Sequence, residues 1–137
     1  DKIFIQYNQK ADSKDLYLNT VKTDATAVFD EKWTLEALCN IVDNAIKYTV
    51  TGGISINVIV YEFFVRIDIS DTGIGISDNE HEKVFSRFYR SEKVNTTEGV
   101  GIGLYLARKI ITGENGYIKV SSLPEHGSTF SVFLSKL

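Results

Sequence analysis

The sequence has little of three features that would each point to a particular class of protein. It contains one cysteine, Cys39, so it offers neither a disulfide framework nor a zinc cluster, which is consistent with a reducing compartment. Its formal net charge is −3 and no basic stripe is present, so we expect no nucleic-acid partner. No apolar run reaches membrane-spanning length and nothing resembles a signal peptide, so we expect no direct membrane contact by this chain.

The composition is otherwise typical of one globular domain. With 137 residues, of which 43% are hydrophobic, the chain is long enough to bury a core. No internal repeat, low-complexity segment or linker divides it. We therefore predict a single domain over residues 1–137, with its core in about 15–137. The chain starts abruptly, as a fragment of a longer protein would.

The best-defined predicted element is a helix that begins near Glu31, with Asp30 as its N-cap. Trp33 and Leu35 start its apolar stripe, and the glycines of residues 51–53 predict its end. Apolar side chains recur at the helical period and form one face that is suited to a core. That face carries Leu35, Leu38, Val42, Ala45, Ile46 and Thr49.

The opposite face of this helix carries Glu36, Asn40, Asn44, Lys47 and Tyr48. Asparagine is a poor helix former, and a merely solvated face would more often use Glu, Lys, Gln or Arg. The two asparagines, one turn apart, leave two interpretations open. The face is either an ordinary solvated one or one that holds a polar ligand.

Shorter patterns predict the elements around this helix. Residues 1–14 fit either the end of a helix or a short edge strand. Two strands joined near residues 61–63 indicate a hairpin, because apolar and polar residues alternate along both. Helices separated by hairpin strands predict an α+β fold, a two-layer sandwich with helices on one face of a mixed, largely antiparallel sheet. The predicted strands are 15–21, about 27–29, 54–60, 65–70, 117–122 and 128–134, and the further predicted helices are a short one at 79–85 and a longer one at 102–112.

Two glycine-rich segments carry the candidate chemistry. The segment 71–76 leaves the end of a strand, and its glycines would let the backbone pass close to a ligand. Asp71 could accept a hydrogen bond from an exocyclic amine such as that of adenine, although the motif alone favours a plain turn. The segment 99–104 opens the second long helix, whose free N–H groups and positive dipole form a phosphate site unless the segment is only a hinge. Neither segment fits a Rossmann fingerprint or a P-loop, so a bound nucleotide would need a different cradle.

Five segments, taken in order, resemble the motifs of one family. They are similar to the ATP-binding catalytic domain of sensor histidine kinases, within the wider class that includes DNA gyrase, MutL and the heat-shock-chaperone ATPases. The resemblance implies the two-layer Bergerat fold. The matching segments are an N box at Asn40–Thr49, a first glycine box at Asp71–Ile76, an F box at Phe85–Phe88, a second glycine box at Gly99–Leu104 and a closing motif at Gly127–Phe130.

The resemblance also implies the cofactors, ATP and Mg²⁺, and the residues that bind them. Asn44 would ligate the Mg²⁺ that bridges the phosphates, with Asn40 beside it, because an amide oxygen is an acceptable hard ligand. Lys47 would pair with phosphate. The implied ATP-binding set is Asn40, Asn44, Lys47, Tyr48, Asp71, Gly73, Gly75, Ile76, Phe88, Arg90, Gly99, Val100, Gly101, Ile102, Gly103, Leu104 and Thr129.

Further roles follow from the same resemblance. Tyr48 would pack near the nucleoside, and Asp71 would read the adenine amine with help from Gly75 and Thr129. Arg90 would reach the γ-phosphate and stabilise charge during transfer, so the implied catalytic residues are Asn44, Lys47 and Arg90. Residues 86–99 would form a lid over ATP.

One position separates the branches of this class. In the gyrase and chaperone ATPases, a glutamate one helical turn before the metal-binding asparagine activates water. That position is Asn40 here, and an amide cannot act as a base near neutral pH. Glu36 lies two turns before Asn44, roughly 12 Å by helical rise, which is too far to substitute. The resemblance therefore favours a kinase that transfers phosphate over an ATPase that hydrolyses ATP.

The implied partners lie outside this chain. A kinase of this family phosphorylates a histidine on a helical-hairpin domain, and its downstream partner is a response regulator. Neither His81 nor His126 has that helical context, so we expect both to be ordinary surface residues. The parent would be a membrane-bound bacterial protein with this piece on its cytoplasmic side, and the piece alone would be monomeric. Two alternatives remain: an ATPase of the gyrase class, and a non-catalytic module that binds a partner protein.

Overall fold

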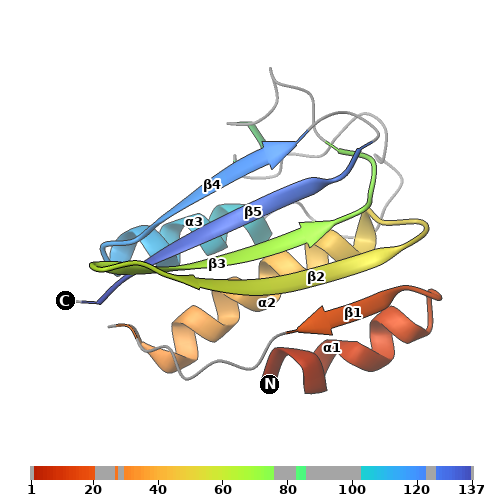
Figure 1. The fold of residues 1–137 in the computed structure, drawn as a ribbon, viewed down its shortest axis with the longest axis horizontal. Coiled ribbons are helices and arrows are strands. Elements are labelled where there is room, and N and C mark those ends of the chain that lie inside the picture. The colour runs from red at the N-terminus through yellow and green to blue at the C-terminus, as the bar shows by residue number, and fades with distance from the viewer. Residues whose placement is uncertain are drawn as a thin grey trace.

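The computed structural model shows a five-stranded sheet with helices on one side of it (Figure 1). It describes residues 2–20, 27, 30–75, 83–85, 103–122 and 126–136. In that part of the chain the strand order is β1-β2-β3-β5-β4, with β1 parallel to β2 and all other neighbours antiparallel. The strands are β1 (Tyr17–Thr20), β2 (Gly53–Val60), β3 (Phe64–Asp71), β4 (Tyr117–Ser122) and β5 (Ser128–Ser135).

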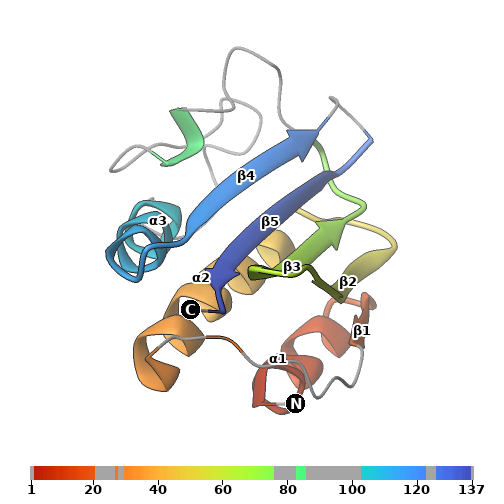
Figure 2. The same cartoon turned by 60° about the vertical axis from the view of Figure 1, so that its left-hand side comes forward.

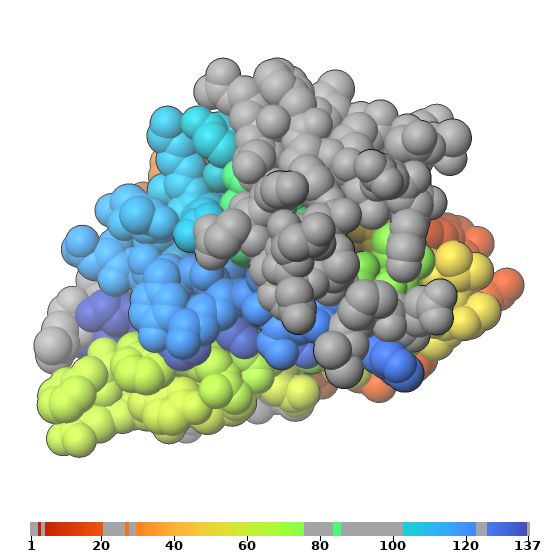
Figure 3. Space-filling view, turned by 90° about the horizontal axis from the view of Figure 1, so that it is seen from above, coloured from red at the N-terminus to blue at the C-terminus, as the bar shows by residue number. Residues whose placement is uncertain are grey.

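Three described α-helices lie on the same side of this sheet, as the two views in Figures 1 and 2 agree. They are α1 (Lys2–Asp12), α2 (Glu31–Lys47) and α3 (Gly103–Gly113). Figure 3 looks onto the β4 edge and shows α3, then β4, then the turn between β2 and β3 across its left part. The structure therefore confirms the predicted α+β fold, with helices on one face of a mixed, largely antiparallel sheet. None of the described helices is long and apolar enough to cross a membrane.

The core lies between α2, α3 and the helix-facing side of the sheet. The alternation along the strands sets this side, because Ile54, Ile69 and Val132 are fully buried and Ser55, Ser70 and Ser131 beside them are only half-buried. Ile41 and Ile46 of α2 meet them from the helical layer, and both are also fully buried. Asp71 has the same parity in β3 as Ile69, so it lies on the helix-facing side at the end of that strand.

Helix α2 begins as predicted. The Asp30 side chain accepts a hydrogen bond from the N–H of Trp33 at 3.0 Å, which satisfies one of the free donors of the first turn. The prediction that Trp33 starts the apolar stripe is wrong, because its side chain is 53% exposed. The buried stripe starts one residue later, at Thr34, whose hydroxyl donates to the Glu114 carboxylate.

The end of α2 differs from the prediction. The α-helix ends at Lys47 with Tyr48 as its C-cap, before the glycines of residues 51–53. Other groups take the carbonyls of the last turn: the Lys14 ammonium binds the carbonyl of Ile46 at 2.6 Å. Thr49 leaves the helical path, and its buried hydroxyl donates back to the carbonyl of Ala45 at 2.7 Å. Long-range contacts thus stop the helix before glycine could.

The remaining elements follow the predictions closely. The hairpin of β2 and β3, the helix α3 and the strands β4 and β5 all lie within a few residues of their predicted ranges. The alternatives left open for residues 1–14 resolve to a helix, α1, and not to an edge strand. Of the predicted short helix at 79–85, residues 83–85 form a 3-10 turn and the others lie outside the described residues. Ala27 is not in a strand, and the rest of the predicted strand at 27–29 also lies outside them.

Candidate functional site

The turn after β3 is built around the Asp71 carboxylate. Its Oδ1 accepts a hydrogen bond from the N–H of Gly73 at 2.9 Å. Burial raises the pKa of Asp71, and hydrogen bonds from the backbone of Gly73 and Ser128 offset part of that rise. The result is a largely buried acceptor, oriented by two backbone donors, at the end of a central strand. Such a group suits a ligand that brings its own hydrogen-bond donor.

Gly73 brings this turn directly against the end of α2. A Cβ at Gly73 would lie 2.4 Å from the carbonyl oxygen of Tyr48 and 3.0 Å from Oγ1 of Thr49. The N–H of Ile74 donates to the same Tyr48 carbonyl at 3.4 Å. Gly75 has a φ of +73°, a conformation that favours glycine. The structure therefore brings together Tyr48, Asp71, Gly73 and Gly75, which the sequence pattern placed in two separate motifs.

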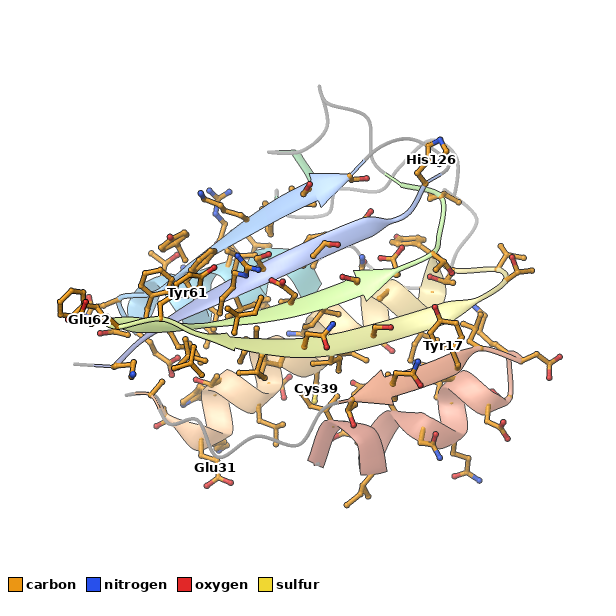
Figure 4. The ribbon with its side chains drawn as sticks, in the orientation of Figure 1. Tyr17, Glu31, Cys39, Tyr61, Glu62 and His126 are labelled. Atoms are coloured by element: carbon orange, nitrogen blue, oxygen red, sulfur yellow. The ribbon has the colours of Figure 1, made fainter. Side chains whose placement is uncertain are left out.

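The loop before β5 closes over the same strand end. Gly127 has a φ of +83°, and a Cβ there would lie 2.1 Å from the carbonyl oxygen of Asp71. The next residue, Ser128, is buried and pairs directly with Asp71 in the register of β3 and β5. Figure 4 shows His126, which is exposed, at this end of the sheet, while Tyr61 and Glu62 mark the opposite end.

Thr129 does not lie beside Asp71. Its hydroxyl is 2.9 Å from that of Ser70, which it opposes in the register, and alternation puts both on the sheet face away from the helices. Ser128, on the helix-facing side beside Asp71, is therefore a candidate site residue that the sequence reasoning missed. A signal was available, because Phe130 is a core residue and residues two apart in a strand share a face.

The polar face of α2 meets the beginning of α3. Gly103 is the first residue of α3, and a Cβ there would lie 3.8 Å from the Cβ of Asn40. The Nδ2 atom of Asn40 is buried and has no hydrogen-bond partner among the described residues. A buried donor without an acceptor costs free energy, so this amide fits a ligand that supplies an acceptor oxygen, such as a phosphate.

Asn44 and Lys47 are half-buried on the same face of α2. The Lys47 ammonium lies 3.2 Å from the carboxylate of Asp43, one turn before it. The same carboxylate also binds the ammonium of Lys10, from α1. Burial would raise the pKa of Asp43, but its hydrogen bonds to Lys10 and Lys47 outweigh burial and the net pKa is lowered. Lys47 therefore shares its charge with Asp43, and a phosphate would join an existing ion pair.

The rest of the predicted set is only partly described. Leu104 is buried in α3. Phe85, the first residue of the predicted F box, is also buried, with its ring edge-on to Phe130 at 6.0 Å between centroids. The predicted site residues Ile76, Phe88, Arg90, Gly99, Val100, Gly101 and Ile102, the predicted lid at 86–99 and His81 lie outside the described residues.

Comparisons with known proteins place this arrangement in a family. Residues 29–137 match the family model described as "Histidine kinase-, DNA gyrase B-, and HSP90-like ATPase". The chain is 38% identical over 133 residues to the adaptive-response sensory kinase SasA of Crocosphaera subtropica, which covers 94% of this chain and 35% of that protein. It is 36% identical over 134 residues to the sensor-like histidine kinase SenX3 of Mycobacterium tuberculosis, which covers 93% of this chain and 32% of that protein. The chain thus spans about a third of the length of these relatives.

Solved structures show the same fold. The catalytic domain of histidine kinase ThkA, in a nucleotide-free form, is similar with a TM-score of 0.83 and 26% identity, covering 98% of this chain and 90% of that one. Full-length ShkA in complex with AMPPNP is similar with a TM-score of 0.84 and 20% identity, covering 97% of this chain and 28% of that one.

Proposed function

The chain belongs to the histidine kinase-, DNA gyrase B- and HSP90-like ATPase family, as a catalytic domain of the sensor histidine kinase type, and from this premise we propose that it binds Mg-ATP and donates the γ-phosphoryl group to a histidine on a separate helical-hairpin domain of the same kinase. One observation carries the proposal. The second half of α2 contacts the Asp71 turn at Tyr48 and the first residue of α3 at Asn40, so its Asn40–Lys47 face runs between the two.

The Asp71 end of this site would hold the adenine. The carboxylate of Asp71 would accept the hydrogen bond of the exocyclic amine, since it is partly buried and two backbone donors already fix its position. Ser128 faces the same side beside it and would add a hydroxyl, in place of Thr129. The Gly73 turn would let the base approach the backbone closely.

The other end would hold the phosphates and the metal. Asn44 would hold Mg²⁺ through its amide oxygen, and Mg²⁺ needs few protein ligands when phosphate and water supply the rest. The amide of Asn40, whose Nδ2 has no partner in the part of the chain that the structure describes, and the charge of Lys47 would face the phosphate oxygens, together with the N–H groups at the start of α3. Arg90, from the lid, would stabilise charge on the γ-phosphate, a role that rests on the family resemblance alone.

Asn40 favours transfer over hydrolysis. It stands one turn before Asn44, where an ATPase of this class would need a base, and an amide takes up no proton near neutral pH. We further propose a response regulator as the downstream partner and a membrane-bound parent with this domain in the cytoplasm. Both rest on the likeness to sensor kinases.

The deciding experiment has two arms. Calorimetry with AMPPNP and Mg²⁺ should show binding to the wild-type chain and weakened binding to Asn44→Asp. The second arm supplies the parent's helical-hairpin domain with γ-labelled ATP and should yield acid-labile phosphate on it, but none when its histidine is replaced by glutamine. Absence of binding heat would favour the non-catalytic module. Steady phosphate release that is lost in Glu36→Ala would favour the ATPase.

A further inference from the structure

Helix α1 reaches the proposed phosphate end of the site with a lysine. The helix precedes the part of the chain that matches the family model, residues 29–137, and it packs against β1 and α2. Its Lys10 ammonium binds Oδ1 of Asp43, while Lys47 binds Oδ2 of the same carboxylate at 3.2 Å. One carboxylate on α2 is therefore shared between a cation from α1 and the cation assigned to phosphate.

The charges of this triad decide what Lys47 can offer to an anion. With all three groups ionised, one negative and two positive charges leave a net charge of +1. Without Lys10, Asp43 and Lys47 would form a neutral pair. Both oxygens of the carboxylate would then be available to Lys47 and would compete with a phosphate for its ammonium. The three side chains keep exposed fractions of 48%, 26% and 33% for Lys10, Asp43 and Lys47, so solvent screens but does not abolish their interaction.

We propose that Lys10 is a positioning residue of the nucleotide site, which acts by sharing Asp43 and thereby leaving the charge of Lys47 available to the phosphates. This inference rests on the proposed function. It extends the site to α1, outside the matched region. Lys10 itself touches Asp43 and not the nucleotide, so its effect should depend on the charge of the ligand and not on its base.

Other contacts position Lys10 and the end of α2 relative to each other. The ring of Tyr7 lies under the Lys10 ammonium, with 6.0 Å from Nζ to the ring centroid. Lys14, in the turn that follows α1, binds the carbonyls of Ile46 and Lys47, at 2.6 Å and 3.4 Å. The Lys14 contacts hold the turn after α1 against the part of α2 that carries Lys47. A purely structural role for Lys10 is thus the competing explanation, and the experiment must separate the two.

The test compares two ligands that differ in charge. Calorimetry would measure the affinities for Mg-AMPPNP and Mg-ADP in the wild type, Lys10→Met, Lys10→Arg and the double variant Lys10→Met/Asp43→Asn. We expect Lys10→Met to weaken Mg-AMPPNP binding about three- to tenfold, to weaken Mg-ADP binding less, and to lose part of the effect at high salt. Lys10→Arg should bind as the wild type does. The double variant should recover wild-type affinity, because no carboxylate then competes for Lys47.

A matched control removes the same charge elsewhere on the molecule. Lys32 lies in the first turn of α2, about 22 Å from Lys47 by helical rise, so Lys32→Met should leave both affinities unchanged. Three results would overturn the inference: wild-type affinities in Lys10→Met, an equal loss for both ligands, or a double variant no better than Lys10→Met. Failure of the wild type to bind AMPPNP would instead overturn the proposed function.

Discussion

The two ends of the candidate site are built by different physical means. At the Asp71 end, backbone segments approach so closely that a Cβ on Gly73 or Gly127 would lie 2.1–2.4 Å from a carbonyl oxygen. At the Lys47 end, the contacts are ion pairs between half-exposed side chains from α1 and α2. The first end is fixed by shape and the second by charge.

This difference sets how each end should respond to change. A close backbone approach leaves no room for an added atom, because packed interiors transmit even small displacements. Ion pairs between half-exposed groups can rearrange around a phosphate, but they weaken with salt and acid. The Asp71 end should therefore be sensitive to steric variants, and the Lys47 end to charge and solution conditions.

The largest effect is expected from a methyl group at the Asp71 end. Gly127→Ala should lower the free energy of unfolding by roughly 2–5 kcal/mol, because its Cβ would meet the Asp71 carbonyl and its φ of +83° strains an L-residue. Gly73→Ala should cost about 1–3 kcal/mol for the clash with the Tyr48 carbonyl. Urea unfolding measures both losses of stability. Both variants should also lose AMPPNP binding.

Gly113 provides the control for these variants. It is the last residue of α3, and a Cβ there would meet nothing within 4 Å. Gly113→Ala should stay within about 0.5 kcal/mol of the wild type. Equal destabilisation at Gly113 and Gly127 would show that the close approach seen at the Asp71 turn does not govern stability.

The next largest effect is expected at the carboxylate itself. Asp71→Asn should weaken AMPPNP binding about ten- to a hundredfold, since a hydrogen bond to a charged acceptor is lost. The fold should tolerate this change better than Gly127→Ala, because the amide oxygen can still accept from the N–H of Gly73. Calorimetry and thermal unfolding together check both statements, and unchanged affinity would remove Asp71 from the site.

The nucleotide affinity of the wild type should depend on pH because of the Asp71 carboxyl. Burial raises the pKa of Asp71, so the group takes up a proton at a higher pH than an ordinary aspartate does. Nucleotide affinity should therefore fall as the pH drops through this raised pKa, and Asp71→Asn should lack that fall. The folded state binds this proton more tightly than the unfolded state, so this group favours folding more as the pH falls through its folded pKa.

A smaller effect should distinguish the two faces of β5. Ser128→Ala should weaken AMPPNP binding by about three- to tenfold, because a neutral hydrogen bond contributes about 1 kcal/mol. Thr129→Ala changes a hydroxyl that bonds to Ser70 on the far face, so the affinity should not change. The reverse ranking in a calorimetric titration would show that the hydroxyl from Thr129 reads the base after all.

The smallest effect is expected from the ion pairs at the Lys47 end. Lys10 and Lys47 lower the pKa of Asp43 in the folded state, so their stabilisation is present above the unfolded pKa and is lost as the pH falls through the folded one. The loss should be at most about 1 kcal/mol, because the partners are partly exposed. Urea unfolding at neutral and acid pH should show it in the wild type and not in Asp43→Asn. A similar loss in both proteins would assign it to other groups.

Much of the fold could be predicted because the patterns are local. Alternation marked the hairpin of β2 and β3, and the 3.6-residue period marked the buried face of α2. The errors arose where distant segments compete with local preference. Trp33 looked like a core residue but is exposed, and α2 ends at Lys47, where Lys14, from the turn after α1, binds the carbonyl of Ile46 before the glycines of 51–53.

The sequence alone determined the order of the motifs, the type of most elements and the residue at the position of the catalytic base, because each depends on neighbours along the chain. Only the tertiary structure decided that Ser128, and not Thr129, lies beside Asp71, and that Lys10 binds a carboxylate 33 residues away. Register and helix docking set these contacts, since they result from packing the whole core and not from any one segment.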